Sequence, residues 1–383
     1  MAAEFVEIGR AMREWIDRRV FPHANAWEES QALPPDVLDE FAAAGWFGAG
    51  LPQEWGGLNL QSEAMCRFCA EMARGSVSLL SLFTVHNMVS QAVLRWGTPE
   101  QRLSWLPLLA SGRTRAAFAL TEPGFGSDAA GIQCQVRREN DALVLDGAKK
   151  WISGSCHAQL FLVMARMGDE GAVALLVPAD TPGLTITPMK DLLGFRAAGI
   201  ARLDFADCVL SPSSLLGTVG GGFTFVASHA LDHGRFTVGC GCVGVLEACL
   251  EASVIYAKER TQFGQALRKH QLIQEMIANM ATDLEAARAL VLHAGRERDA
   301  MSPDSIMLVT TAKYFCSRAA LRAASDALQI HGGNGCSPEY PIMRYYRDAK
   351  ICEIIEGSSQ MQQLMISNQA CLRQRVPRRP RHG

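Results

Sequence analysis

The chain has 383 residues, of which 48% are hydrophobic and 20% charged, a composition typical of globular proteins. This length is too great for one small core, so we expect two or three domains. With 37 basic and 39 acidic residues the formal net charge is −2, which gives no general electrostatic reason to expect a nucleic-acid or membrane partner.

The first segment, MAAEFVEIGRAMREWIDRRV, alternates charged and apolar residues at helical spacing. It lacks the apolar core of a signal peptide, and we expect no segment elsewhere to be long and apolar enough to span a bilayer. The sequence therefore predicts a soluble, cytoplasmic protein whose 12 cysteines are reduced and mostly buried. The pairs Cys66/Cys69 and Cys240/Cys242 lack a further Cys or His pair at metal-ligand spacing, so packing is favoured over a zinc site.

The hydrophobic period divides the chain into zones. Residues 1–112 have a helical period interrupted by Pro and Gly, and the run from Ser78 to Trp96 is apolar nearly all round, as in a buried helix. Residues 113–215 contain short β-favouring runs separated by turn dipeptides, which predicts an antiparallel β-domain. Within it, Asp146-Gly147 predicts a tight hairpin turn.

The helical period returns in residues 216–372, after the glycine-rich GTVGGGF. From Leu272 to Val291 apolar residues recur at spacings of three and four, which predicts a long helix with one apolar face, buried in a bundle or against another subunit. Residues 373–383 are rich in Arg and Pro, and we expect a basic disordered tail in preference to a binding arm.

The segment EIIEGSSQMQQL places Glu356 between two isoleucines and a Gly-Ser-Ser turn. Ser359 to Gln362 matches a capping box, which predicts that a helix begins directly after this turn. The helix dipole favours the charge of Glu356, whereas the apolar neighbours oppose it. Glu356 is therefore a candidate general base, although the pattern by itself favours a solvated loop residue.

Five motifs resemble the acyl-CoA dehydrogenase family in order and spacing. They are AFALTEPGFGSDAAGI (117–132), KKWISG (149–154), LDHGR (231–235), ERTQFG (259–264) and the segment from Ile330 to Gln362. The resemblance covers the chain to about residue 370. It implies an α+β fold with an N-terminal helical domain (1–112), a middle antiparallel β-domain (113–215) and a C-terminal four-helix bundle (216–372), and it implies FAD as the cofactor.

The resemblance also implies a reaction, in which two hydrogens leave the α and β carbons of an acyl thioester and FAD accepts the β hydrogen. The family's base is the Glu of an E-G-[ST] turn, which is Glu356 here. The thioester carbonyl is held by the backbone N–H of that residue and a ribityl hydroxyl of the flavin. Some members place the base directly before the Arg of the LDxxR motif, but Gly234 occupies that position and cannot abstract a proton. Arg235 would either lie near the base or pair with Asp232 or another acid.

The family's flavin and substrate contacts map onto several segments of this chain. Trp151 is expected to pack against the flavin ring, although the strand pattern alone favours a core residue, and Ser153 to donate towards N5. The first strand and loop supply Phe118, Leu120, Thr121 and Ser127. Ser127 could instead bind the pantetheine arm of the substrate. Substrate contacts are expected at Ser127, Asp232, Arg235 and Gly357.

The diphosphate and adenine of FAD are expected to lie between two subunits. One chain supplies Arg260, Phe263 and Gln271. The other supplies Gln329, Gly332, Gly333, Ser358 and Gln360. Arginine offers a fork to phosphate, and glycine lets the backbone approach closely. A complete site then requires at least a homodimer, and the family's usual state is a homotetramer.

The sequence defines the acyl group of the substrate less well than it defines the reaction. Ile355 replaces the Tyr that many fatty-acid relatives carry before the base, and Ser358 replaces their Thr. With GCGCVG at residues 239–244, these features resemble relatives that oxidise acyl groups on carrier proteins in polyketide or peptide biosynthesis, where the product can be an oxidised hydroxymalonyl group. A short polar acyl group on an acyl carrier protein and a short-chain acyl-CoA are equally favoured. A carrier-bound substrate would predict basic side chains at the mouth of the groove.

Two other classes are considered. A non-catalytic assembly subunit is disfavoured because Glu356, Ser153 and the flavin motifs are intact. A flavin oxidase that uses oxygen is disfavoured because acyl-CoA oxidases are longer chains with an added C-terminal domain, and a nitroalkane-type oxidase would carry Asp as its base. A dehydrogenase that passes electrons to an electron-transfer flavoprotein or a similar acceptor is favoured.

Overall fold

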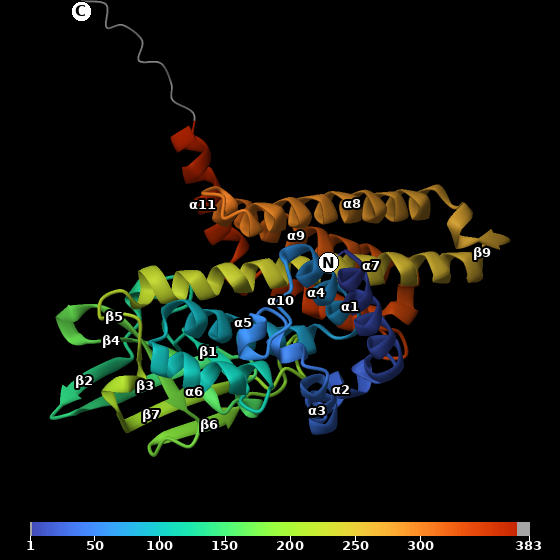
Figure 1. Cartoon of the computed structure of the whole chain (residues 1–383). Helices are drawn as coiled ribbons and strands as arrows, with labels where there is room; N and C mark the ends of the chain where they lie inside the picture. The colour runs from blue at the N-terminus through green and yellow to red at the C-terminus, as the bar shows by residue number, and fades with distance from the viewer. Residues whose placement is uncertain (1, 374–383) are drawn as a thin grey trace, which may run out of the picture.

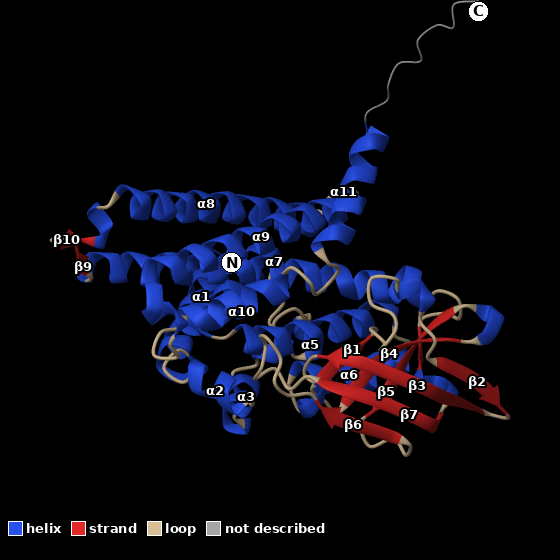
Figure 2. Ribbon diagram, turned by 180° about the vertical axis from the view of Figure 1, so that it is seen from behind, coloured by secondary structure: helices blue, strands red, loops and turns tan. Residues whose placement is uncertain are grey.

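The computed structural model describes residues 2–373, which form helices, then a sheet, then helices (Figure 1). The long C-terminal helices lie side by side along one edge of the molecule, and the strands gather at one end beneath them (Figure 2). The predicted basic tail lies outside the described residues, apart from Arg373.

Between residues 2 and 110 the chain forms six α-helices. They are α1 (Ala2–Trp15), α2 (Ala24–Ser30), α3 (Pro35–Ala43), α4 (Ser62–Gly75), α5 (Val77–Trp96) and α6 (Pro99–Ala110). The predicted buried helix is confirmed as α5, in which every residue from Val77 to Val93 is buried. Ser76 caps α5 by accepting a hydrogen bond from the N–H of Leu79. α5 packs against the sheet and against the C-terminal helix α7 (Ser228–Glu259), so it lies between the two layers.

The expectation that no segment is long and apolar enough to cross a membrane is wrong. Both Val77–Trp96 and Gly222–Glu259 reach that length and apolar character. In this fold, 94% and 67% of their most apolar stretches are buried inside the protein, as is usual for core helices.

The middle zone forms one eight-stranded sheet. Its strands are β1 (Ala116–Ala119), β2 (Gln135–Glu139), β3 (Ala142–Ile152), β4 (Leu160–Arg166), β5 (Ala172–Pro178), β6 (Leu184–Pro188), β7 (Ala201–Leu210) and β8 (Leu215–Leu216). The order is β6-β7-β3-β2-β4-β5-β8, with β1 beside β4. Most neighbours are antiparallel as predicted, but β1 and β2 both run parallel to β4, so the sheet is mixed.

The predicted hairpin turn at Asp146-Gly147 is wrong, because β3 runs unbroken through both residues and forms a bulge against β7. Gly147 has a φ of 134°, and a Cβ there would lie 2.8 Å from the Cα of Cys134. The glycine is therefore needed for a bulge and a close backbone approach. The hairpin turn instead joins β2 to β3, where Asn140 has a φ of 52°.

The C-terminal zone contains α7, α8 (Gln271–Asp299), α9 (Ser305–His331), α10 (Ile342–Cys352) and α11 (Ser359–Arg373). The short hairpin of β9 (Thr261–Gln262) and β10 (Gln265–Ala266) joins α7 to α8. The predicted long helix is confirmed as α8, whose buried residues include Met280, Leu284, Ala287 and Val291. Leu272 in its first turn is 71% exposed, so no other part of the described chain packs over the start of the apolar face of α8.

The four paired cysteines pack in the core, as predicted. Cys66 and Cys69 on α4 and Cys240 and Cys242 on α7 all belong to one buried hydrophobic cluster. Of the 12 cysteines, all except Cys156, Cys336 and Cys371 are buried.

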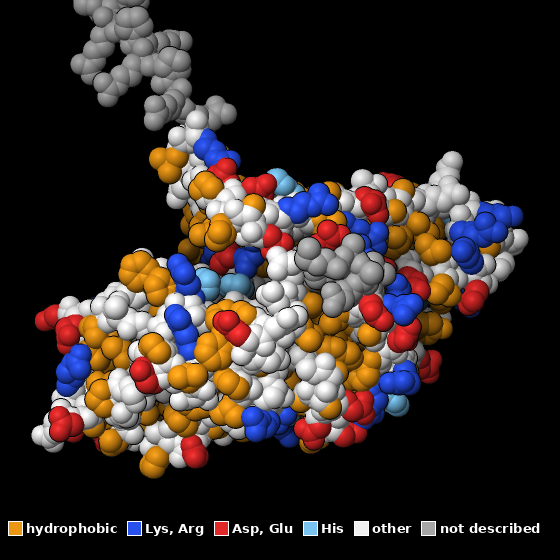
Figure 3. All heavy atoms as spheres, viewed as in Figure 1, with side chains coloured by type: hydrophobic (Ala, Val, Ile, Leu, Met, Phe, Trp, Pro, Cys, Tyr) orange, Lys and Arg blue, Asp and Glu red, His pale blue; other side chains and the backbone are white. Residues whose placement is uncertain are grey.

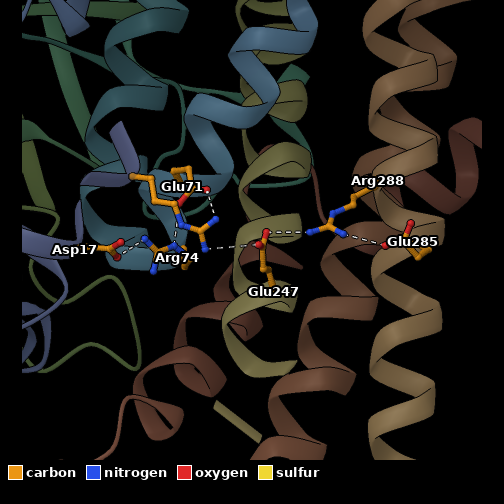
Figure 4. Close-up of polar contacts among 7 residues, drawn as sticks. Asp17, Glu71, Arg74, Glu247, Glu285 and Arg288 are labelled. Atoms are coloured by element: carbon orange, nitrogen blue, oxygen red, sulfur yellow. Dashed lines mark hydrogen bonds and ion pairs between the residues drawn. The ribbon is translucent and has the colours of Figure 1, made fainter. Parts of the chain in front are cut away.

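A chain of ion pairs joins the N-terminal helices to the C-terminal bundle (Figure 4). On α4, Arg74 pairs with Asp17 and with Glu71. On α7, Glu247 lies 3.1 Å from Arg288 of α8, and Arg13 of α1 lies 3.5 Å from Glu71 and 3.9 Å from Glu247. Through Arg13 these contacts link α4 to α7 on the side of the bundle that faces the N-terminal helices.

Candidate active site

A cavity of about 1860 Å³ lies between α5, α7, the loop after β1 and the turn that carries Glu356. Figure 3 shows the molecule hollowed beneath the layer of C-terminal helices, with histidine and basic side chains in the hollow. The predicted site residues that line this cavity are Phe118, Leu120, Thr121, Ser127, Trp151, Ser153, Asp232, Arg235, Glu356, Gly357 and Ser358. Sequence segments that lie far apart therefore meet around one space.

The remaining predicted flavin contacts do not line the cavity in this chain. Arg260, Phe263 and Gln271 lie around the β9–β10 hairpin, at the end of the bundle opposite α11 (Figure 1). Gln329, Gly332 and Gly333 lie at the end of α9 and just beyond it, and Gln360 is exposed on α11. Their proposed contact with the FAD of a neighbouring subunit stays a prediction.

Glu356 lies in a tight turn between α10 and α11. Its φ is 54° and that of Gly357 is 91°, so two consecutive residues adopt left-handed backbone. Such a conformation is costly for a non-glycine residue and persists only where its surroundings hold it. Here Arg235 Nε donates to the carbonyl of Glu356 at 3.0 Å, while Lys313 Nζ and Gln362 Nε2 donate to the carbonyl of Gly357 at 3.0 and 3.1 Å.

The Glu356 carboxylate faces α7 at Gly234. A Cβ at Gly234 would lie 2.6 Å from Glu356 Oε2 and 2.7 Å from the sulfur of Met88. Glu356 Oε2 is buried and has no hydrogen-bond partner among the residues that the structure describes. Burial raises the pKa of Glu356 to about 7, against the opposing effects of Lys313 and then Arg235. The carboxylate is thus held close to its protonation midpoint at neutral pH.

The helix that follows this turn is capped one residue earlier than the sequence indicated. The N–H of Met361 donates to the hydroxyl of Ser358 at 3.3 Å, whereas the hydroxyl of Ser359 donates to the carbonyl of Glu353. The predicted capping box from Ser359 is therefore wrong, and Ser358 is the N-cap. Within residues 2–373, the N–H of Glu356 takes part in no hydrogen bond, so it can donate to a ligand.

Asp232 pairs with Arg298 at the end of α8 and not with Arg235. Arg298 also lies 3.1 Å from Nδ1 of His233, and its guanidinium carbon lies 4.9 Å from the ring centre of Phe236. The interpretation of Arg235 as the ion-pair partner of Asp232 is therefore wrong. Arg235 instead supports the turn that carries the candidate base.

Two residues at this site escaped the sequence analysis, namely Lys313 and Arg298. Lys313 is fully buried on α9, between the buried residues Ala312 and Cys316. A cation on the apolar face of a helix is a detectable signal, because burying it without a purpose is costly. Arg298 carried no such signal, since a basic residue in the last turn of a helix is common.

The wall formed by the sheet fits a flavin ring. Trp151 has a φ of 63° and is 50% exposed, so it is not a core residue, and its ring lines the cavity. Phe118 and Leu120 line the same space, and Thr121 and Ser153 add hydroxyl groups. Aromatic and apolar side chains with hydroxyl donors beside them suit a large planar heterocycle.

A buried ion pair joins the two segments of this wall. Lys149 is completely buried, and its Nζ donates to Glu122 Oε1 at 2.7 Å and to the carbonyl of Leu120 at 3.0 Å. Glu122 also accepts hydrogen bonds from the N–H groups of Gln133 and Cys134. Because both side chains make several hydrogen bonds, this buried pair connects the loop after β1 to β3, the strand that contains Trp151.

The chain matches three descriptions of one family along its length. They are the N-terminal domain of acyl-CoA dehydrogenase over residues 3–113, the middle domain over 117–208 and the C-terminal domain over 220–371. The chain is 34% identical to the mitochondrial isobutyryl-CoA dehydrogenase of Dictyostelium discoideum, covering 93% of this chain and 86% of that protein. It is 36% identical to the human mitochondrial short-chain specific acyl-CoA dehydrogenase, covering 93% and 87%.

Solved structures show the same fold. A glutaryl-CoA dehydrogenase from Mycobacterium smegmatis in complex with FADH2 has a TM-score of 0.91 at 30% identity, with 98% and 96% of the two chains covered. FkbI, for biosynthesis of the methoxymalonyl extender unit of the polyketide Fk520, has a TM-score of 0.88 at 31% identity, with 96% and 99% covered. The prolyl acyl carrier protein oxidase AnaB has a TM-score of 0.91 at 25% identity, with 96% and 98% covered.

The family matches span all three zones of the chain, the relatives cover nearly its whole length, and the cavity wall fits the cofactor that the family uses. The protein is a FAD-dependent oxidoreductase, and the chain belongs to the acyl-CoA dehydrogenase family.

Proposed function

We propose that this protein catalyses the α,β-dehydrogenation of an acyl thioester, with Glu356 abstracting the α-proton. The observation that supports this most directly is the buried, unpartnered Oε2 of Glu356, which shares a cavity with the flavin-fitting wall of the sheet. A base with a pKa near 7 accepts a proton efficiently at neutral pH. When bound, FAD supplies the acceptor for the β hydrogen, which leaves as hydride to flavin N5.

The chain supplies the remaining requirements of proton abstraction. The N–H of Glu356, which takes part in no hydrogen bond within residues 2–373, is proposed to donate to the thioester carbonyl, which would acidify the α-proton by stabilising the enolate. Arg235 donates to the carbonyl of the same residue and so stabilises the turn that carries this N–H. Substrate contacts are proposed at Ser127, Asp232 and Gly357, which line the cavity.

The carrier of the acyl group is proposed to be either coenzyme A or an acyl carrier protein. The short-chain and glutaryl-CoA relatives favour coenzyme A. The likeness to FkbI and AnaB favours a carrier protein and a biosynthetic pathway, in which basic side chains at the cavity mouth would meet an acidic carrier. An electron-transfer flavoprotein or a similar acceptor, a homodimeric or homotetrameric state and a cytoplasmic location remain predictions.

The test is anaerobic reduction of the bound flavin by short acyl thioesters, followed as loss of the yellow absorbance. Glu356→Gln should slow this reduction by about 10²- to 10⁴-fold, the usual contribution of a general base. Glu353→Gln is the matched control, because Glu353 lies in the same segment, pairs with Lys350 and does not line the cavity. Reduction of Glu356→Gln at the parent rate would reject Glu356 as the base.

The same assay also distinguishes between the two acyl carriers and between the possible electron acceptors. Bleaching only by carrier-bound thioesters assigns the enzyme to a biosynthetic pathway, and bleaching by CoA thioesters assigns it to acyl-CoA oxidation. AnaB is named an oxidase, which supports a second candidate in which oxygen accepts the electrons. Hydrogen peroxide released in step with thioester oxidation in air would favour that candidate. A flavin that no thioester reduces would favour a non-catalytic assembly subunit.

A further inference from the structure

One face of α5 lines the cavity with polar side chains. Ser81, Thr84, Asn87 and Gln91 follow one another at spacings of three and four, so they share a face of the helix. They are only 5%, 2%, 3% and 8% exposed, yet they line the cavity. Polar groups shielded from bulk water but open to a cavity are available to a ligand.

This polar face passes the candidate base, with Thr84 and Ser81 on one side of that point and Gln91 on the other. Met88 of α5 and Glu356 both approach Gly234 on α7. One turn away on each helix lie Thr84 and Thr237, whose hydroxyl oxygens are 3.1 Å apart. A helical turn rises about 5.4 Å, so this hydroxyl pair is roughly that far from the base along the helices. That distance corresponds to about three or four bonds of an extended acyl chain.

The hydrogen-bond directions at this pair decide what a ligand must offer. Thr237 Oγ1 has one hydrogen, and it lies within bonding distance of the helix carbonyls of Gly234 at 3.1 Å and His233 at 3.2 Å. Either hydroxyl of the pair could be the donor; with the hydrogen of Thr237 directed at those carbonyls, its oxygen accepts from Thr84, whose own hydrogen is then used. Thr84 is left with acceptor lone pairs, so its partner in the cavity must be a hydrogen-bond donor.

Two neighbours of this pair also lack partners. Across residues 2–373, Ser81 and Asn87 form no side-chain hydrogen bond, whereas Gln91 donates to the carbonyl of Gly50 at 2.6 Å. An aliphatic acyl chain would leave both groups dry and unpaired, which is unfavourable. A hydroxyl or N–H group on the acyl chain near Thr84 would lie within one helical turn of Ser81.

The charges nearby do not suit a carboxylate. Of the arginines in the cavity wall, Arg298 is paired with Asp232, and Arg235 bonds the turn of Glu356. The histidines there, His229 and His233, have pKa values lowered by burial, which disfavours their charged form. A carboxylate at the end of the acyl chain would be desolvated without a free cation, and Thr84 could not donate to it.

We propose that the acyl group carries a neutral hydrogen-bond donor, a hydroxyl or N–H, about three or four bonds beyond the α carbon, and that Thr84 binds it, with Ser81 as the next polar group along the helix. This inference names the substrate class of the proposed reaction and rests on that reaction for the position of the α carbon. Thr84 is the specificity-determining residue.

The test compares pantetheine thioesters, because coenzyme A and carrier proteins share that arm. Two pairs replace a terminal methyl by a hydroxyl: 4-hydroxybutyryl against pentanoyl, and 5-hydroxypentanoyl against hexanoyl. Their affinities are measured by calorimetry on FAD-loaded Glu356→Gln protein, in which the slow reaction does not consume the ligand. At least one hydroxylated thioester should bind about tenfold or more tightly than its partner, because the partner leaves polar groups unpaired.

Variants assign the preference to residues. Thr84→Val keeps the shape of the side chain and should reduce the preference to about twofold or less. Ser90→Ala is the matched control, since Ser90 is a buried hydroxyl of the same helix that bonds the carbonyl of His86 at 2.8 Å and does not line the cavity. This control should keep the full preference.

Equal affinity within both pairs, or tighter binding of the methyl member, would overturn the inference. Tighter binding of the glutaryl thioester than of either hydroxylated one would also overturn it. Hydroxyl preference without flavin bleaching in the parent protein would reject the proposed reaction and keep this inference. Flavin bleaching without any preference for the hydroxylated thioesters would keep the proposed reaction and reject this inference.

Discussion

At the scale of single residues, Glu356 and Gly234 share one small space. Substitution of Gly234 by Ala would place a methyl group 2.6 Å from the carboxylate oxygen, so the carboxylate must shift although alanine favours helix. We expect Gly234→Ala to lower the rate of flavin reduction by about 10²-fold, the usual effect of misplacing a reacting group.

Gly239→Ala is the control for that prediction. Gly239 lies on the same helix, and a Cβ there would meet its nearest neighbours, the atoms of Lys313, at an ordinary 3.5 Å. If both variants reduce the flavin at the parent rate, the contact between position 234 and the carboxylate has no role in catalysis.

Lys313 is a buried cation that bonds the turn of the candidate base, and its charge lowers the pKa of Glu356. Lys313→Met removes that charge, so the pKa of Glu356 should rise above its present value of about 7. Because the base acts when deprotonated, the acid limb of the rate–pH profile should move to higher pH. Stopped-flow flavin reduction between pH 5 and 9 measures this shift.

A purely structural lysine would behave differently. Lys313→Met would then lower the rate equally at every pH, and Lys313→Arg would not restore the profile. Burial lowers the pKa of Lys313 itself to about 8, so the parent enzyme should also lose this cation in the upper part of the same pH range.

At the scale of elements, the bulge in β3 depends on one glycine. Gly147→Ala would set a Cβ 2.8 Å from the backbone of Cys134 at a φ of 134°, which a side chain rarely adopts. We expect it to lower the free energy of unfolding by about 1–3 kcal/mol, as for an overpacked site. Urea denaturation measures this loss.

Gly168→Ala is the comparison for a methyl group at a positive φ that meets no neighbour. Gly168 also has a positive φ, of 49°, but no atom lies within 4 Å of a Cβ built there. It should cost much less than Gly147→Ala. Equal losses would assign the effect to backbone conformation alone.

The elements also show how far the sequence predicts this fold. α5 and α8 were predictable because each carries its own signal, continuous apolar residues in one and a single apolar face in the other. The Asp146-Gly147 hairpin failed because the close approach of Cys134, a long-range contact, decides what that glycine does. The strand pattern around Trp151 favours a core residue, but its side chain is half exposed because it faces the cavity.

The candidate site was predictable only in part. Periodicity located Glu356 in a turn before a helix, and the family resemblance selected it as the base. The pattern contained no sign that Lys313 and Arg235 hold that turn, because their bonds are to backbone carbonyls from distant helices. Nor could it show the hydroxyl pair of Thr84 and Thr237, which only the packing of α5 on α7 creates.

At the scale of the whole molecule, the predicted flavin contacts lie in separate places. The tip of the β9–β10 hairpin carries Phe263, which is 96% exposed with a φ of 50°, far along the bundle from α11 (Figure 1). Such a strained, exposed aromatic is a candidate for a contact in another subunit. We expect Phe263→Ala to lower the FAD content of the purified protein, measured as flavin absorbance per chain alongside mass from light scattering.

Leu103→Ala provides the comparison, because Leu103 is also an exposed apolar residue, 67% exposed on α6, with no predicted role. It should leave FAD content and mass unchanged. A parent protein that is monomeric and fully loaded with FAD would refute the shared site.

The shared space of Gly234 and Glu356 also restricts how such an enzyme can change through descent. A carboxylate at both positions would overlap and repel, and a small residue at both would leave no base. One arrangement has the base in the turn at position 356, and the other has it on the helix at position 234. Neither single substitution is therefore a functional step between these two arrangements. A lineage that moves its base from the turn to the helix must change both positions together or pass through an inactive ancestor, so the two arrangements should persist as separate lineages.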